Sequence, residues 1–305
     1  MRNSAIQHLA ILDDSAIVAA AFFEKTVQIW SWKSCDQIGE FETVLDFGGK
    51  RLAVTPDGSA CIVGSYGRRG HLGGGIAAYS IPNGVILWHR TDIRCIQYVR
   101  LSGSGRQIYC GIEGEPAYVL ETATGTTIER ISGAVEIIGS GYTAHKLIIE
   151  KERYIIIGED EPVEVAPNSF ALLDASFSPD AVCIAEPKNA LHPREQPGGV
   201  RVVNLVAGDP RWHVALRSNH VTFNSADGWF YCVAHSQIEQ NERSLVRVAG
   251  SELDCAQIIM LGQCREEAFS PSGRLLVTAH GDVYETSTGN QVAFFDFPQR
   301  DYPNS

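Results

Sequence analysis

The sequence predicts an all-β chain built from repeated four-stranded units. Short runs rich in Val, Ile, Tyr, Phe and Trp, such as TVQIWSW (26–32) and WFYCVAH (229–235), alternate with clusters of Gly, Pro, Asp and Ser. This texture is typical of many antiparallel strands joined by tight turns. No long stretch has helical periodicity, and a turn followed by a strand recurs along the chain.

The recurring turn gives the size of the unit. Its copies are Asp14-Ser15, Pro56-Asp57-Gly58, Ser104-Gly105, Pro179-Asp180, Ala226-Asp227-Gly228 and Pro271-Ser272-Gly273, with a weaker one at Thr143-Ala144. The steps average about 43 residues, and a period of about 40–45 residues with four strands per unit is typical of a β-propeller. The sequence therefore predicts a single propeller of about seven blades. Six or eight blades remain alternatives, because the fourth unit matches the repeat least well.

We expect one domain over residues 1–305, with blades at approximately 4–44, 45–91, 92–131, 132–167, 168–216, 217–262 and 263–297. The last unit has four strands of its own, so no N-terminal strand is needed to complete it. How the ring closes is therefore left open. Six positions after the turn, five units carry a small residue: Ala21, Gly64, Gly111, Ala234 and Ala279. Only small side chains fit where the backbones of neighbouring blades approach most closely.

A second turn precedes the expected outermost strand of four units. It lies at Pro82-Asn83-Gly84, Thr122-Ala123-Thr124-Gly125, Ala207-Gly208-Asp209 and Thr286-Ser287-Thr288-Gly289. Together with VQIWSW (27–32) and the TPDG and SPSG turns, these segments resemble the WD-repeat family, whose blades end in a Trp-Asp pair followed by a Thr-Gly turn. Only Trp30 keeps the tryptophan, Ser31 replaces the aspartate, and the family's Gly-His pair is missing. The resemblance implies the fold and leaves the subfamily open.

The chain is acidic, with a formal net charge of −11 and a pI of about 5.3. Such a surface repels phosphate backbones, so we expect no nucleic-acid partner, and it attracts basic protein surfaces. Solubility is the simpler explanation of the same charge. The longest apolar run, AIVAAAFF (16–23), is far shorter than the roughly 20 residues that span a bilayer, and Asp13 and Asp14 interrupt any signal peptide. We therefore expect no membrane contact and a cytoplasmic location.

The cysteines and histidines give no sign of a metal site. None of the eight cysteines forms a CxxC pair, and no two of the nine histidines have helical ligand spacing such as HExxH. His235 and His280 hold equivalent positions after the second strands of two units, where they either face each other or cap their strands. Cys61, Cys110, Cys183 and Cys232 lie in apolar strand-like runs, where free cysteine behaves as a small buried hydrophobe. We therefore expect reduced thiols, no metal and no cofactor.

Three expected units have a long loop between their second and third strands, at 66–75, 186–199 and 235–242. In a propeller these loops emerge on one face, and loops on a rigid scaffold are where binding residues concentrate. The alternative is that insertions accumulate in loops because they are tolerated there. The predicted partner-binding residues are Arg68, Arg69, His71, His192, Arg194, Glu195, Gln240 and Asn241.

The leading hypothesis is a non-enzymatic module that binds a macromolecular partner through this rim. A more specific version is an immunity protein that neutralises a basic toxin. The alternative is a metal-dependent propeller hydrolase or lactonase with a site in the central channel. Its candidate carboxylates, Asp92, Asp174, Glu266 and Glu267, form no repeated motif, and no GxSxG sequence occurs. We expect Trp88, Trp212 and Trp229 to serve packing, whereas an exposed one would be an interface anchor. The oligomeric state is left open.

Overall fold

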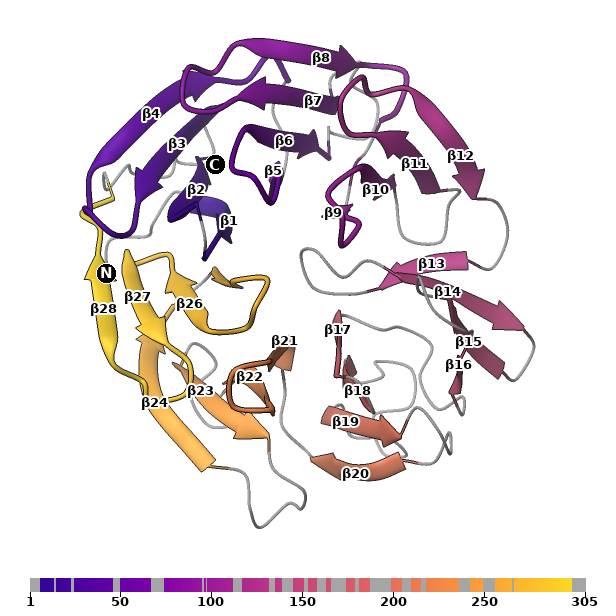
Figure 1. Cartoon of the computed structure of the whole chain (residues 1–305), viewed down its shortest axis with the longest axis vertical. Coiled ribbons are helices and arrows are strands. Elements are labelled where there is room, and N and C mark those ends of the chain that lie inside the picture. Colours follow the sequence, from indigo (N-terminus) through magenta and orange to yellow (C-terminus); the bar gives the residue numbers. More distant parts are fainter. Residues whose placement is uncertain are drawn as a thin grey trace.

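The computed structural model is a ring of antiparallel sheets around one axis (Figure 1). It describes residues 6–13, 15–22, 25–45, 50–66, 74–94, 96, 98–111, 117–131, 135–138, 145–150, 153–157, 163–165, 174–178, 181–186, 199–204, 210–214, 218–235, 242–248, 256–264 and 266–297. Over these residues the chain forms seven four-stranded sheets, which confirms the predicted all-β propeller.

Each blade is a meander of four strands consecutive in sequence. Blades 1 and 2 contain β1 (Ile6–Ile11), β2 (Ile17–Phe22), β3 (Thr26–Ser31) and β4 (Gln37–Glu42), then β5 (Lys50–Val54), β6 (Ala60–Ser65), β7 (Gly75–Ser80) and β8 (Ile86–Arg90). Blades 3 and 4 contain β9 (Tyr98–Leu101), β10 (Gln107–Gly111), β11 (Ala117–Glu121) and β12 (Thr127–Ile131), then β13 (Val135–Ile138), β14 (His145–Glu150), β15 (Arg153–Ile157) and β16 (Val163–Val165).

The remaining three blades follow the same order. Blade 5 contains β17 (Asp174–Phe177), β18 (Ala181–Glu186), β19 (Gly199–Asn204) and β20 (Pro210–Val214). Blade 6 contains β21 (Ser218–Asn224), β22 (Trp229–His235), β23 (Glu242–Val248) and β24 (Ala256–Gln263). Blade 7 contains β25 (Glu267–Phe269), β26 (Leu275–Thr278), β27 (Asp282–Glu285) and β28 (Gln291–Phe294).

The antiparallel meander gives the ring two different faces. We call "turn face" the end at which the first strand of a blade turns into its second and the third into its fourth. We call "loop face" the opposite end, where second strands end, third strands begin and the chain passes to the next blade. The strands that bracket the three predicted long loops therefore all end or begin on the loop face: β6 and β7, β18 and β19, β22 and β23.

The turn face repeats one backbone conformation. Gly58, Gly105, Gly228 and Gly273 after the first strands, and Gly84, Gly125 and Gly289 after the third, have φ between +65° and +78°. Left-handed backbone favours glycine because other residues place a Cβ against the following carbonyl. Close packing adds a second reason, since a Cβ on Gly125 would come 2.5 Å from the Trp88 ring of the preceding blade. Six of these seven glycines thus allow close contact with the preceding blade, and the exception is Gly228, which has open space around it within the described part of the chain.

Blade 1 has cysteine where blades 2, 3 and 7 have the left-handed glycine after their third strand. The backbone N–H of Cys35 donates to Ser31 O at 2.8 Å, as Gly84 N donates to Ser80 O, and the φ of Cys35 is +60°. We expect Cys35→Gly to raise the free energy of unfolding by about 0.5–1 kcal/mol, because the left-handed strain is removed at some cost in chain entropy. Urea denaturation measures the change.

The matched control is Gly84→Ala at the equivalent turn. Gly84 has a φ of +65°, and an added Cβ would contact the Phe41 side chain. This substitution is expected to lower the free energy of unfolding. A loss of stability in both variants would contradict the proposed equivalence of the two turns.

The outermost strands of blades 1, 2, 3 and 7 share a one-residue bulge. In blade 1, Ile29 faces Gly39 and Trp30 faces Gln37, so Ile38 has no opposing residue. Leu87, Ile128 and Val292 hold the same position on β8, β12 and β28, and all four aliphatic side chains are exposed. Because a bulge interrupts the hydrogen-bonding edge, these strands are poor templates for an added strand.

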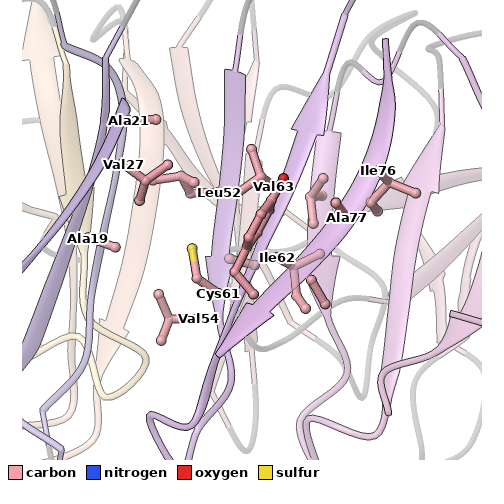
Figure 2. Close-up of a cluster of buried hydrophobic side chains, with 14 of the residues drawn as sticks. Ala19, Ala21, Val27, Leu52, Val54, Cys61, Ile62, Val63, Ile76 and Ala77 are labelled. Carbon is pink, nitrogen blue, oxygen red and sulfur yellow. The ribbon is translucent and has the colours of Figure 1, made fainter. Parts of the chain in front are cut away.

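Neighbouring blades pack through their faces, as Figure 2 shows for blades 1 and 2. Ala19 and Ala21 of β2 lie in one buried cluster with Leu52, Val54 and Cys61 of the next blade. The five small residues predicted at blade contacts, Ala21, Gly64, Gly111, Ala234 and Ala279, are all buried. A Cβ on Gly64 would come 2.6 Å from methyl groups of both Ile96 and Val99, so a side chain fits at this position only if its neighbours shift.

The ring closes by packing of two complete blades, since β1–β4 and β25–β28 are separate sheets. β1 packs against β25 and β26. The Trp30 ring lies 5.6 Å from Phe295 and 5.7 Å from Phe297 between ring centroids, in a buried cluster with Leu9 and Val277.

One aspartate adds a polar contact to the closure. Asp13 accepts hydrogen bonds from the Ser270 hydroxyl at 2.9 Å and from the Ser272 backbone N–H at 3.3 Å. The first and last blades are thus joined without an exchanged strand.

Candidate functional site

All eight predicted partner-binding residues lie outside the described residues. They are Arg68, Arg69, His71, His192, Arg194, Glu195, Gln240 and Asn241. The described strand ends on either side of them, Ser65 and Gly75, Glu186 and Gly199, and His235 and Glu242, all belong to the loop face.

Four polar residues lie at or near the beginning of innermost strands. The beginning of each innermost strand is its end nearest the loop face. His8 lies on β1, Arg51 on β5, His220 on β21, and Glu266 directly precedes β25. β1 packs against β5 and β25, and β21 packs against β25, so the four residues come from adjoining blades. We call these four residues the axial cluster. Sequence reasoning considered Glu266 only as a metal ligand and missed the other three.

His8 is held neutral. Burial lowers the pKa of its imidazole from 6.5 to about 3, and the charges of Arg51 and His220 lower it further. Its Nδ1 accepts a hydrogen bond from the backbone N–H of Leu52 at 3.3 Å. In a neutral ring the proton is then on Nε2, which makes that atom a hydrogen-bond donor.

Glu266 is the acidic member of the axial cluster. Partial burial raises the pKa of its carboxyl group, while the nearby charges of His220, Arg51 and Arg243 oppose the rise. The cluster therefore combines cationic and neutral donors with one carboxylate. Such a set can form directional hydrogen bonds and ion pairs with polar groups of a partner.

A buried ion pair lies beside the cluster, between blades 6 and 7. Arg243 of β23 donates to Oε2 of Glu267, and the two side chains are 14% and 1% exposed. Oε1 of Glu267 is buried and has no hydrogen-bond partner among the described residues. Burial lowers the pKa of Arg243, opposed by Cys264 and Glu266. Loss of either member would leave the other charged group buried without its ion-pair partner.

The four carboxylates considered for a metal site come from different parts of the ring, except for the adjacent Glu266 and Glu267. Asp92 forms an exposed ion pair with Arg90, Glu267 is paired with Arg243, and Asp174 lies on the first strand of blade 5. Within the described residues, no group of three His, Cys, Asp or Glu side chains could hold a metal ion. Cys61, Cys110, Cys183 and Cys232 are buried, as predicted, and form no disulfide among the described residues; burial raises the pKa of Cys61 and Cys110 to about 12.

The sequence signal for the axial cluster is a polar residue early in an innermost strand. His8 stands inside the run IQHLAI, and His220 stands inside SNHVTFN. Alternation alone places such residues on one side of a strand. It does not show that strands some 200 residues apart in sequence meet at the ring axis, because that follows only from closure of the ring.

The low pKa of His8 predicts an acid-sensitive fold. Below pH 6.5 the unfolded chain binds a proton at His8, whereas the folded protein does so only near pH 3, so stability decreases as the pH falls between these values. We expect the free energy of unfolding to fall less steeply with decreasing pH in His8→Gln than in the wild type, by up to about 1.4 kcal/mol per pH unit. Urea denaturation between pH 7 and pH 4 measures it. His89→Gln, at an exposed position, is the control, and equal slopes in the wild type and His8→Gln would refute the assignment.

The architecture defines the chain as a single β-propeller. No protein-family model and no curated protein matches the sequence. Within the described residues, no helix has the length and apolar character that a membrane crossing needs.

Similarity to solved structures places the fold among WD-repeat propellers, which confirms the resemblance seen in the sequence. The WD40 repeats of RRP9 superpose with a TM-score of 0.63 at 13% identity, over 91% of this chain and 88% of that one. A chain of the mitotic checkpoint complex matches with a TM-score of 0.63 at 13% identity, over 91% and 85%. A chain of the Kuenenia stuttgartiensis hydrazine synthase matches with a TM-score of 0.64 at 12% identity, over 95% of both chains. At this identity the likeness shows the fold alone.

Proposed function

We propose that the chain is a non-enzymatic interaction module that binds a protein through the loop face. The observation that carries the proposal is the coincidence of two features on this face. The axial cluster gathers polar side chains from blades 1, 2, 6 and 7, and the strands that bracket all three long loops end at the same side. A rigid ring with many interblade contacts can hold such a surface preformed, which lowers the entropic cost of binding.

Two further considerations support this function. A structurally similar chain is part of the mitotic checkpoint complex, so the fold serves in a multi-protein assembly there. The net charge of −11 favours a partner with a basic surface, because long-range attraction increases the association rate. An immunity protein that neutralises a basic toxin in the cytoplasm is the most specific form of the proposal.

The experiment begins with affinity purification and mass spectrometry of the intact chain to identify the partner. The loops 66–75, 186–199 and 235–242 are then shortened together, and binding is measured by surface plasmon resonance. We expect affinity to fall at least about tenfold and association to slow with added salt. Phe294→Ala, on the outer edge strand, serves as the control. Unchanged affinity of the shortened protein would refute the loop-face site.

A second test addresses the immunity role alone. Cells that express a basic toxin together with the intact chain are expected to survive, and the loop-shortened chain should fail to protect them. Tight binding to a partner that is not toxic would refute the immunity role and leave the interaction module intact.

A further inference from the structure

Trp229 differs from the other tryptophans with described side chains. The indole N–H groups of Trp30, Trp32 and Trp88 donate to Gln28 Oε1, Leu12 O and Thr122 O, respectively. Trp229 is 40% exposed, and its indole N–H has no acceptor among the described residues. It lies at the start of β22, directly after a turn, and therefore on the turn face, opposite to the loop face.

Arg247 lies against this exposed ring. Its guanidinium carbon is 5.0 Å from the Trp229 ring centroid, a distance typical of a cation–π contact. No described carboxylate forms an ion pair with Arg247, and its Nε is buried without a hydrogen-bond partner. The nearby Asp227 accepts instead from the Tyr231 hydroxyl at 2.6 Å and from the Trp229 backbone N–H at 3.1 Å.

The surroundings hold the pair in place. Asn224 Nδ2 donates to Thr286 Oγ1 at 3.2 Å and joins the turns of blades 6 and 7 beside Trp229. Tyr231, which is buried, pairs with Arg247 across β22 and β23. Tryptophan and arginine are the residue types that dominate binding energy at protein interfaces, and here an exposed tryptophan lies against an arginine that has no ion-pair partner among the described residues.

We propose that the Trp229–Arg247 pair is a docking site for an acidic segment of a protein partner. An aspartate or glutamate of that segment accepts hydrogen bonds from the guanidinium, and an adjacent apolar side chain covers the indole. Arginine suits this role because its planar donors match a carboxylate. The chain as a whole carries a charge of −11, so it repels extended polyanions. A short acidic segment can still bind, because salt screens charges that lie more than about one Debye length, ~8 Å, from the site. The site is separate from the loop face and independent of the function proposed there.

The probe is a phage-displayed library of random dodecapeptides, selected on the intact chain and counter-screened on Trp229→Ala and Arg247→Gln. We expect enriched peptides that contain Asp or Glu next to an apolar residue and that fail to bind either variant. For one selected peptide, replacement of the acid by its amide should weaken binding at least about tenfold by calorimetry. Arg247→Lys keeps the charge without the fork of donors and should also bind more weakly.

Thermal unfolding of each variant shows that the fold is intact, and Phe294→Ala is the matched exposed aromatic control. Peptides that lack acidic residues, that bind the variants equally, or that cannot be selected at all would overturn the proposal. Complete competition by millimolar inorganic phosphate, or tighter binding of a single-stranded oligonucleotide, would assign the site to phosphate groups and overturn the acidic segment. Shortened loops should leave peptide binding unchanged, which separates this result from the test of the loop face.

Discussion

Replacing Phe295 by alanine is expected to lower the free energy of unfolding by about 3–5 kcal/mol. Phe295 is fully buried, and its ring lies 5.6 Å from both Trp30 and Phe297 between centroids. The substitution removes apolar burial and two aromatic contacts and leaves a cavity where the first and last blades meet. Equilibrium denaturation in urea measures the loss.

The neighbouring residue provides the control. Phe294 is 51% exposed, so Phe294→Ala should change stability by no more than about 0.5 kcal/mol. Equal effects of the two substitutions would contradict a closure that depends on this cluster. Hydrogen exchange adds a spatial readout, because the loss in Phe295→Ala should be greatest in β1 and β26.

Replacing Glu267 by alanine is expected to cost about 3–5 kcal/mol, because Arg243 is then left partly buried without its partner. Glu266 acts on Arg243 electrostatically and compensates part of the loss. Replacement of both members by apolar residues, as in the double variant Arg243→Met and Glu267→Leu, should lower the free energy of unfolding less than Glu267→Ala alone. Denaturation of the single and double variants at pH 7 gives the coupling between the two side chains.

An exposed ion pair in the same protein serves as the reference for the buried Arg243–Glu267 pair. Arg90 and Asp92 are bridged at 2.5 Å, and Asp92 is 64% exposed. Asp92→Asn should therefore cost no more than about 1 kcal/mol. If the two acid substitutions had the same effect, burial of the Arg243–Glu267 pair would not be the cause of its contribution.

The fold was predictable because its repeat is local. The turn glycines and the small residues six positions later each reflect a requirement of a single blade or of one blade contact, and periodicity reveals both. The left-handed backbone at Cys35 was not predicted, because cysteine, unlike glycine, has no preference for this conformation. Aligning SWKSC (31–35) with SIPNG (80–84) would have revealed it.

The functional residues were less accessible to prediction. Long loops can be recognised in a sequence, but all eight residues chosen on them lie outside the described residues. His8, Arg51, His220 and Glu266 come together only because blades 1 and 7 meet, and no local pattern encodes that meeting. Trp229 was expected to serve packing, and the structure instead exposes it against Arg247. Exposure depends on which neighbouring segments cover a strand end, and strand patterns carry no such information.

The contacts between blades 1 and 7, such as Asp13 with Ser270 across 257 positions of sequence, join the two ends of the row of blades, whereas the other interblade strand contacts of the described residues join blades that are neighbours along the chain. The protein thus behaves as a row of nearest-neighbour units that has been made cyclic by one extra junction. Forming that junction carries the greatest chain-entropy cost, so it is expected late in folding. Once the junction has formed, blades 1 and 7 each pack against two neighbouring blades. Neither blade is then a terminal unit that can unfold by itself from an end of the row.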